Sequence, residues 1–210
     1  MNKLIKKKLI NYQWTNETHH TPSITKSIEK ILKRTTKSTF EHVDVGCGNG
    51  FITSKIRKYF KTSIGIDLSK QGIYFANKNY KSKNLKFYLK DMQSLINEKK
   101  KFDYVTTIEV IEHQYDPFKF MECLEKILKK NGYLLITTPF HGYFKNLIMS
   151  IFGLMDNHFT ALWNHGHIKF FSIKTLKKLI SNYKFEIVDI SYSGRIYPLS
   201  SSMIFLLKRK

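Results

Sequence analysis

Two short segments of this 210-residue chain carry residue types that could do chemistry. One segment places three glycines at alternate positions after an acid, in Asp44-Val45-Gly46-Cys47-Gly48-Asn49-Gly50. Glycines adopt positive φ and let a ligand approach the backbone, so this pattern predicts a nucleotide-binding turn between a strand and a helix. The other segment holds two carboxylates and an imidazole within five residues, in Glu109-Val110-Ile111-Glu112-His113. Such a set could bind a divalent ion or take a proton from a substrate.

The glycine segment favours one class of nucleotide ligand. A dinucleotide fingerprint needs a glycine at position 51, where this chain has Phe51. Asp44 suits a ligand that carries an ammonium group, and its charge would repel phosphates. Acids also end the next two expected strands: Asp67 could accept hydrogen bonds from both ribose hydroxyls, and Asp91 could accept one from an adenine amino group.

These segments together resemble a known family. The glycine segment, Gly65-Ile66-Asp67-Leu68-Ser69 and Lys90-Asp91-Met92 look like the first three motifs of class I S-adenosylmethionine-dependent methyltransferases. The resemblance covers roughly residues 40–140. It implies S-adenosylmethionine as the cofactor and a Rossmann-like α/β fold, with a seven-stranded sheet of order 3-2-1-4-5-7-6, the last strand antiparallel and helices on both faces. The residues it assigns to the cofactor are Asp44, Gly46, Cys47, Gly48, Asp67, Leu68, Asp91 and Met92.

The segment 109–113 carries a second resemblance. It resembles the ExxEH motif of the ubiquinone-biosynthesis O-methyltransferases (the type 11/12 group), which is associated with divalent metal. It also resembles the site of small-RNA 2′-O-methyltransferases, which use two glutamates and two histidines. That likeness implies His167 as the second histidine, although Phe170-Phe171 replaces the acidic-aromatic pair of those enzymes. The expected catalytic centre and site for a divalent cation such as Mg²⁺ is therefore Glu109, Glu112, His113 and His167. The alternative is that Glu109 and His113 shape the pocket by hydrogen bonding, without an ion.

A regular alternation of strands and helices must position these segments. Apolar, β-branched runs predict strands at residues 40–45, 63–67, 85–89, 102–109, 133–138, 185–192 and 203–207. Amphipathic runs predict helices at 23–33, 51–60, 69–79, 116–132 and 172–182, with polar caps before the last three. This alternation predicts a single α/β domain over residues 1–210, in which residues 140–171 form an insertion or lid after the fifth strand.

The insertion is unusually apolar for a connection. Residues on one helical face of it are Tyr143, Leu147, Ile151 and Leu154. We interpret this face as a lid helix packed on the domain. The alternative is an interfacial helix that contacts a membrane peripherally and admits a lipid-like substrate. His158 and His165 are expected to be lid or substrate residues, and Trp14 with His19-His20 to cover the cofactor.

The composition limits the partners. Net charge is +20, yet only four of the 36 basic residues are arginine, and the lysines are spread along the whole chain. This spread is typical of a diffuse solvated surface, so a nucleic-acid partner is not favoured. The basic start lacks an apolar signal core, and the longest apolar run, 143–155, is shorter than the roughly 20 residues of a membrane span. A cytoplasmic protein is therefore expected.

The residues together favour a methyl-transfer enzyme. A sulfonium already carries an activated methyl group, so the protein must mainly position the acceptor and remove a hydroxyl proton. We therefore expect O-methylation of a small-molecule acceptor such as a quinol, a sugar or a lipid-linked precursor. One alternative is RNA 2′-O-methylation with the Glu/Glu/His/His metal site. Another is a non-catalytic, membrane-associated module that binds the cofactor.

Overall fold

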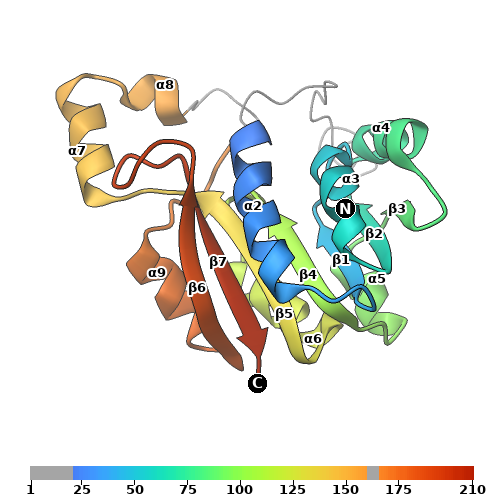
Figure 1. Cartoon of the computed structure of the whole chain (residues 1–210). Helices are drawn as coiled ribbons and strands as arrows, with labels where there is room; N and C mark the ends of the chain where they lie inside the picture. Colours follow the sequence, from blue (N-terminus) through green and yellow to red (C-terminus); the bar gives the residue numbers. More distant parts are fainter. Residues whose placement is uncertain (1–20, 160–165) are drawn as a thin grey trace, which may run out of the picture.

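The chain forms a seven-stranded sheet between two layers of helices (Figure 1). The computed structural model describes residues 21–159 and 166–210. The strands are β1 Glu41–Val45, β2 Thr62–Asp67, β3 Leu85–Leu89, β4 Phe102–Ile108, β5 Leu128–Pro139, β6 Phe185–Ser193 and β7 Ser202–Arg209. Their order is β3-β2-β1-β4-β5-β7-β6, and β7 runs antiparallel to both of its neighbours. The predicted strand order and the antiparallel last strand are confirmed.

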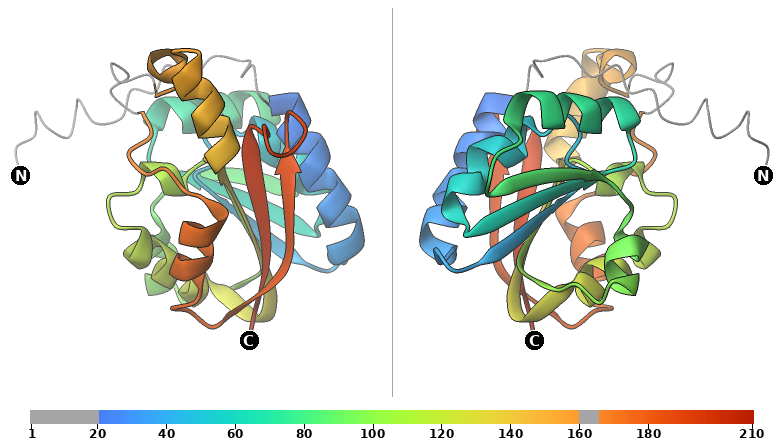
Figure 2. Two further views of the ribbon diagram at one scale, coloured as in Figure 1. Left: turned by 90° about the vertical axis from the view of Figure 1, so that its left-hand side faces the viewer. Right: turned by 90° about the vertical axis from the view of Figure 1, so that its right-hand side faces the viewer.

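Helices cover both faces of the sheet, as Figure 2 shows from two sides. One face carries α2 Thr21–Thr35, α3 Phe51–Ile56 and α4 Lys70–Tyr80. The other carries α5 Met92–Asn97, α6 Pro117–Ile127 and α9 Ile173–Ile180. Two further helices, α7 Tyr143–Ile151 and α8 Met155–Phe159, lie beyond the ends of the parallel strands (Figure 1). Ligands of open α/β sheets bind at the carboxyl ends of the strands. Helices α7 and α8 therefore lie at the edge of the sheet where a site is expected.

Both helical layers are held to the sheet by apolar packing. On one face, Ile28 and Leu32 of α2 are fully buried against Tyr104 of β4. On the other face, Leu124 of α6 and Leu176 of α9 are fully buried in the larger core cluster. Buried apolar residues recur every three or four positions along each of these helices. This is the spacing that predicts an inward-facing stripe.

The predicted helix caps are present. The Ser69 hydroxyl accepts a hydrogen bond from the Gly72 amide at 3.1 Å and starts α4. Ser172 forms a reciprocal capping box with Thr175 at the start of α9. Asp116 accepts from the Lys119 amide at 2.9 Å and starts α6. Side chains that satisfy the first backbone amides therefore fix where these helices begin.

The end of α6 differs from the prediction. The helix stops at Ile127, and the chain enters β5 at once, because Leu128 pairs with Phe102 on β4. Asn131 and Gly132, at which the helix predicted over 116–132 would end, belong instead to an irregular stretch inside β5, where Asn131 has a φ of 61°. Phe118, an apolar residue of the run that predicted this helix, is 55% exposed. The sequence analysis also missed α5, a six-residue helix capped by Asp91.

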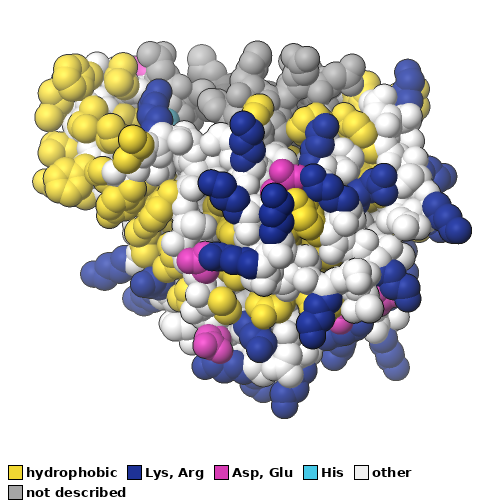
Figure 3. All heavy atoms as spheres, in the orientation of Figure 1, with side chains coloured by type: hydrophobic (Ala, Val, Ile, Leu, Met, Phe, Trp, Pro, Cys, Tyr) yellow, Lys and Arg dark blue, Asp and Glu magenta, His cyan; other side chains and the backbone are white. Residues whose placement is uncertain are grey.

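Within the insertion, most apolar residues of α7 face outward. The expected inward face is exposed, with Tyr143 at 74% and Ile151 at 68%. The side chains that α7 buries are Lys145 and Met149. The interpretation of a lid helix packed by its apolar face is therefore wrong, since these side chains gather on the surface (Figure 3). Within the described parts of the chain, no helix has the length and apolar character to cross a membrane.

Candidate active site

The glycine loop joins the two segments that the sequence singled out. Gly46 has a φ of 76°, and a Cβ added there would lie 2.5 Å from Cγ2 of Val110. Only glycine therefore lets the loop pack against the segment 109–113. The amides of Gly46 and Cys47 both donate to the Ile66 carbonyl, at 2.9 and 3.1 Å, which ties the loop to β2.

Asp67 at the end of β2 also orients this loop. One carboxylate oxygen accepts from the Gly48 amide at 2.8 Å, and the other accepts from the Ser69 amide at 2.7 Å. Burial raises the pKa of Asp67. The neighbouring Leu68 is 58% exposed, so an apolar surface lies beside the acid. The predicted ribose contact of Asp67 stays a prediction, and each of its oxygens has lone-pair capacity beyond the bond it makes.

Asp44 lies beneath the loop. Its two carboxylate oxygens accept hydrogen bonds from the hydroxyls of Thr53 and Thr106, and the residue is only 2% exposed. Burial raises the pKa of Asp44 to about 6, against the lowering effect of the two hydroxyls. The carboxylate anchors β1 to α3 and β4, and the ammonium contact expected for Asp44 stays a prediction. Sequence reasoning missed Thr53 and Thr106, although an acid in a buried strand needs donors nearby.

The other residues assigned to the cofactor line the same edge. Asp91 accepts from the Ser94 amide at 2.9 Å and hydroxyl at 2.7 Å, which lowers its pKa and caps α5. Met92 is half-buried and packs against the core. The Cys47 thiol lies under the loop, where a Cβ on Gly65 would approach its Sγ to 2.8 Å. Burial raises the pKa of Cys47 well above its usual range, which makes packing its evident contribution.

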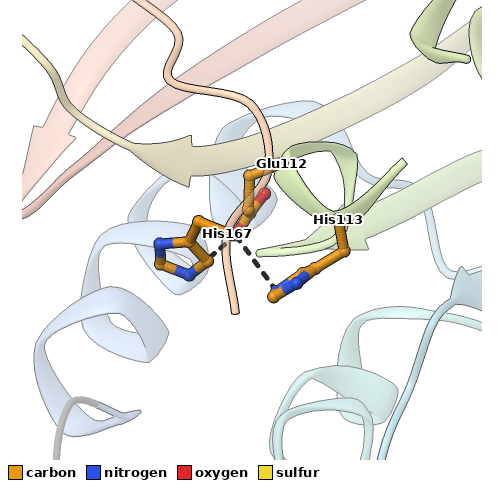
Figure 4. Close-up of side chains that lie close together, drawn as sticks. All are labelled: Glu112, His113 and His167. Carbon is orange, nitrogen blue, oxygen red and sulfur yellow. Dashed lines mark ion pairs between the residues drawn. The ribbon is translucent and has the colours of Figure 1, made fainter. Parts of the chain in front are cut away.

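Glu112, His113 and His167 lie together at the ends of β4 and the insertion (Figure 4). One ligand atom from each residue lies within 4.8 Å of the other two. The Nε2 atoms of His113 and His167 are each 3.9 Å from Oε1 of Glu112. Three of the four residues expected in the catalytic centre are thus brought to one point.

Backbone hydrogen bonds fix the distance between these segments. Glu112 and His113 belong to a 3₁₀ turn, Ile111–His113, that follows β4. The Glu112 carbonyl accepts from the amides of Ile168 and Lys169, both at 3.0 Å. The chain that follows His167 is therefore fastened directly to the turn that carries the other two residues.

The side chains are oriented by further contacts. Thr138 at the end of β5 donates to Oε2 of Glu112 at 3.1 Å, while Oε1 is buried without a hydrogen-bond partner among the described residues. Nδ1 of His113 lies 3.2 Å from the Gly166 carbonyl, which can only accept. Nδ1 therefore carries the proton, and in the neutral ring Nε2 offers a lone pair toward Glu112.

The electrostatics of the group are those of a buried site. Burial raises the pKa of Glu112 well above its usual range, and the charge of Glu109 adds to this effect. Burial and the neighbouring His113 lower the pKa of His167 to about 4. The imidazole of His167 is thus neutral near pH 7, the form that binds metal ions or accepts a proton.

Glu109 lies apart from this group. Its Oε1 accepts from the Thr137 hydroxyl at 2.8 Å, and its backbone has a φ of 55°. Burial raises its pKa, which the Lys145 charge partly opposes. Glu109 thus bonds to β5 near the charge of Lys145 on α7, and it is not one of the three clustered residues. His158 lies beside another histidine, described below, whereas His165, Trp14 and His19-His20 lie outside the described residues.

Known proteins share this sequence and fold. Residues 17–190 match the family described as a methyltransferase domain. The chain is 33% identical over 122 residues to a ubiquinone biosynthesis O-methyltransferase of Pelagibacter ubique, covering 58% of this chain and 49% of that protein. It is 28% identical over 178 residues to the mitochondrial enzyme of the same name from Dictyostelium discoideum, covering 78% and 54%. The chain thus spans about half the length of these curated relatives.

A solved structure confirms the likeness of fold. An S-adenosylmethionine-dependent methyltransferase from Clostridium acetobutylicum superposes with a TM-score of 0.68 at 15% identity, covering 92% of this chain and 93% of that one. The family match spans most of the sequence, and the strand order agrees with the order that the glycine loop and its acids led us to expect. The chain therefore belongs to the methyltransferase-domain family, and its fold is that of the class I enzymes it resembles.

Proposed function

We propose that this protein transfers a methyl group from S-adenosylmethionine to a hydroxyl oxygen of a small molecule such as a quinol, a sugar or a lipid-linked precursor. The observation that carries the proposal is the Glu112, His113 and His167 group, which follows directly on the segment that packs against the cofactor loop. A hydroxyl is a poor nucleophile until its proton is removed, and this group can serve that purpose. The relatives named as O-methyltransferases support the same acceptor atom.

The residues at the loop fit the cofactor. The backbone at Gly46, Gly48 and Gly50 adopts positive φ, so no side chain covers the loop at these positions. Asp67 would accept from the ribose hydroxyls, and Leu68 with Met92 would offer apolar contact to the adenine. When bound, S-adenosylmethionine supplies an activated methyl group on its sulfonium. The task left to the protein is to align the acceptor and accept its proton.

The site also fits a divalent ion. Glu112 presents a buried oxygen that accepts no hydrogen bond from the described residues, and His113 presents a lone pair because its other nitrogen donates to a carbonyl. With His167, these residues would supply one oxygen and two nitrogen ligands. This donor set suits Zn²⁺, Fe²⁺ or Mn²⁺ better than Mg²⁺, which prefers oxygen. An ion there would lower the pKa of an acceptor hydroxyl.

The same residues can act without an ion. Because burial raises the pKa of Glu112, its carboxylate is a stronger base than an exposed one. Thr138 holds that carboxylate through Oε2 and leaves Oε1 toward the histidines. Oε1 of Glu112 or Nε2 of His113 would then take the hydroxyl proton. In this second form of the proposal, the histidines orient the acceptor and share its proton.

The test uses methyl-labelled cofactor and cell extract, separated into lipid, small-molecule and RNA fractions. We expect label in a small-molecule or lipid product, and a loss of at least a hundredfold in His113→Ala. Label confined to RNA would instead support 2′-O-methylation of RNA. No labelled product, despite cofactor binding, would favour a non-catalytic module and contradict the proposal.

A metal-binding measurement separates the two forms of the proposal. Titration of the chelator-treated protein with Zn²⁺ or Mn²⁺ should give one site in the wild type and none in His167→Phe. If chelation leaves the rate of methyl transfer unchanged, the residues act as a base without an ion. If chelation abolishes transfer and the ion restores it, the metal form is correct.

We further propose that α7 contacts a membrane surface peripherally. Figure 3 shows hydrophobic side chains gathered over α7 and α8, while lysines and arginines are dispersed over the rest of that face. Exposed apolar residues there include Phe144 at 60%, Ile151 at 68% and Phe152 at 70%. An exposed apolar helix on a chain with net charge +20 suits an anionic lipid surface.

Cosedimentation with vesicles of anionic and of zwitterionic lipid tests this contact. The double change Ile151→Ser with Phe152→Ser should weaken binding to the anionic vesicles about tenfold, because two exposed apolar side chains no longer insert. Tyr74→Ser is the matched control, since Tyr74 is 64% exposed on α4. Equal binding by the double variant and the wild type would contradict membrane contact through α7.

A further inference from the structure

Helix α7 buries the lysine that it carries. Lys145 is 8% exposed, whereas Phe144 before it is 60% exposed. The Lys145 ammonium donates to the Phe140 carbonyl at 2.9 Å, and an ammonium has three protons to donate. Burial lowers its pKa, and the charge of Arg195 lowers it further, while Glu109 opposes both. Burying a charge is costly, so a lysine turned inward from an exposed helix needs a reason.

His141 lies one helical turn before Lys145 and is also buried. It is 7% exposed, and neither ring nitrogen has a hydrogen-bond partner among the described residues. Its ring centroid lies 5.4 Å from that of His158 and 5.1 Å from that of Phe170. A buried polar group left without a partner costs about 1–3 kcal/mol. Such a cost is typical of a group that awaits a ligand.

We propose that Lys145 and His141, with His158 beside them, form a subsite for an anionic group, a carboxylate or a phosphate, on the methyl acceptor. Lys145 supplies a charge with protons to spare, and His141 supplies one N–H in its neutral form. Arg195 adds a second positive charge near Lys145. The carboxylate of Glu109 is the negative charge that acts on Lys145. These donors suit an anion better than a neutral hydroxyl.

The subsite adjoins the proposed catalytic group. Thr138, which holds Glu112, precedes His141 by three residues at the end of β5. The His141 amide donates to the Phe171 carbonyl at 3.2 Å, which fastens the subsite to the end of the insertion that carries His167. An acceptor held there by its anionic group would present another part to Glu112 and the histidines. The inference rests on the proposed function and narrows its acceptor class.

Calorimetry with benzoate and with phenylphosphonate tests the subsite in the full chain at constant ionic strength. We expect both the carboxylate and the phosphate analogue to bind the wild type, and the neutral benzamide to bind at least tenfold more weakly. The tighter of the two anions identifies the preferred group. Lys145→Met should weaken anion binding at least tenfold, and His141→Phe at least threefold.

Matched controls keep the result interpretable. Lys177→Met removes the same charge from the exposed face of α9 and should leave anion binding unchanged. His141→Phe fits among Phe159 and Phe170, so it gives a second measurement if Lys145→Met folds poorly. Equal binding of benzoate and benzamide, or unchanged benzoate binding in both variants, would overturn the subsite.

The outcome separates the subsite from the proposed reaction. Lys145-dependent benzoate binding without methyl transfer to any acceptor would support the subsite and contradict O-methylation. Methyl transfer by a wild type whose benzoate binding ignores Lys145 would support the reaction and overturn the subsite.

Discussion

Two buried polar regions lie near the same edge of the sheet, and they differ in how their hydrogen bonds are satisfied. Beneath the cofactor loop, His42 bonds to Ser63 at 3.1 Å and to Thr106 at 2.9 Å, and Thr106 donates to Asp44. We call these residues, with Thr53, the loop network. Beneath the insertion, Oε1 of Glu112, both nitrogens of His141 and Oδ1 of Asn146 are buried without partners among the described residues. We call these three residues the insertion group.

The difference separates structural support from ligand binding. A buried network in which every member is hydrogen-bonded stabilises one conformation, because each polar group is already satisfied by the protein. Unpartnered groups reduce stability, so a protein retains them where something else satisfies them. The loop network therefore supports the cofactor loop from below, and the insertion group is where we expect metal and acceptor to bind. Substitutions should then lower stability in the first region and function in the second.

The largest expected effect is a fall in the rate of methyl transfer when Glu112 of the insertion group is replaced. Glu112→Gln keeps the shape of the side chain but removes the base and metal ligand, so the rate of methyl transfer should fall about a hundredfold to ten-thousandfold. The free energy of unfolding should not fall, because Oε1 has no hydrogen bond to lose. Labelled methyl transfer and urea unfolding measure the two quantities.

The exposed Glu186→Gln on β6 is the control for Glu112→Gln and should keep the wild-type rate. A Glu112→Gln protein with full turnover would remove Glu112 from the catalytic centre. A Glu112→Gln protein that is strongly destabilised would show that the carboxylate has a structural role instead.

The next largest effect is on the free energy of unfolding, and two adjacent threonines of β4 test it. Thr106→Val removes one of the two hydrogen bonds of His42 and one of the two of Asp44, and it leaves a buried nitrogen and a buried oxygen unsatisfied, so the free energy of unfolding should fall by about 2–4 kcal/mol. Thr107→Val is the matched control, because the buried Thr107 hydroxyl has no hydrogen-bond partner among the described residues. That change should be neutral or slightly stabilising. Equal losses in the two variants would refute the distinction between bonded and unbonded groups.

The sequence predicted the fold well because local signals agreed with one another. Ser69, Asp116 and Ser172 each satisfy backbone amides within three residues, so a short window of sequence contains the whole interaction. The strand order followed from a family resemblance that the glycine loop and its acids carry. The end of α6 was missed because the pairing of Leu128 with Phe102 is a contact between distant segments.

The site was predicted in part. Glu112, His113 and His167 come together as the resemblance implied, because two amides after His167 bond to the Glu112 carbonyl. Glu109 is not among them: its backbone has a positive φ, and its carboxylate accepts a hydrogen bond from Thr137. The orientation of α7 could not be read from periodicity, because a pattern gives the apolar face but not whether that face turns inward. The sequence alone therefore could not predict that Lys145 and His141 are buried.

A pH effect of about 2 kcal/mol should separate Asp44 from other acids. Its folded-state pKa of about 6 lies above the ordinary 3.8, so its contribution to stability is full at low pH and is lost as the pH rises through 6. Asp44→Asn has no such loss. Between pH 4.5 and 7.5, the free energy of unfolding of the wild type should therefore fall by about 2 kcal/mol relative to that of Asp44→Asn.

Urea unfolding of both proteins across this pH range measures the shift. Asp116→Asn, at the exposed cap of α6, is the control for losing one carboxylate. A difference between wild type and Asp44→Asn that does not change with pH would mean that Asp44 is not buried as an ionisable group.

The smallest expected effect is on the free energy of unfolding when a buried histidine of either region is replaced by phenylalanine. His141→Phe replaces an unpartnered imidazole by an apolar ring between Phe159 and Phe170, so without acceptor the free energy of unfolding should rise by about 1 kcal/mol. His42→Phe should lower it, because that ring makes two hydrogen bonds. Thermal unfolding should then shift upward by about 2–4 °C for His141→Phe. Opposite signs would tie the cost of His141 to its missing partner, since both histidines are buried and only His42 is hydrogen-bonded within the described residues. A loss in both variants would mean that His141 already has its partner in the folded chain.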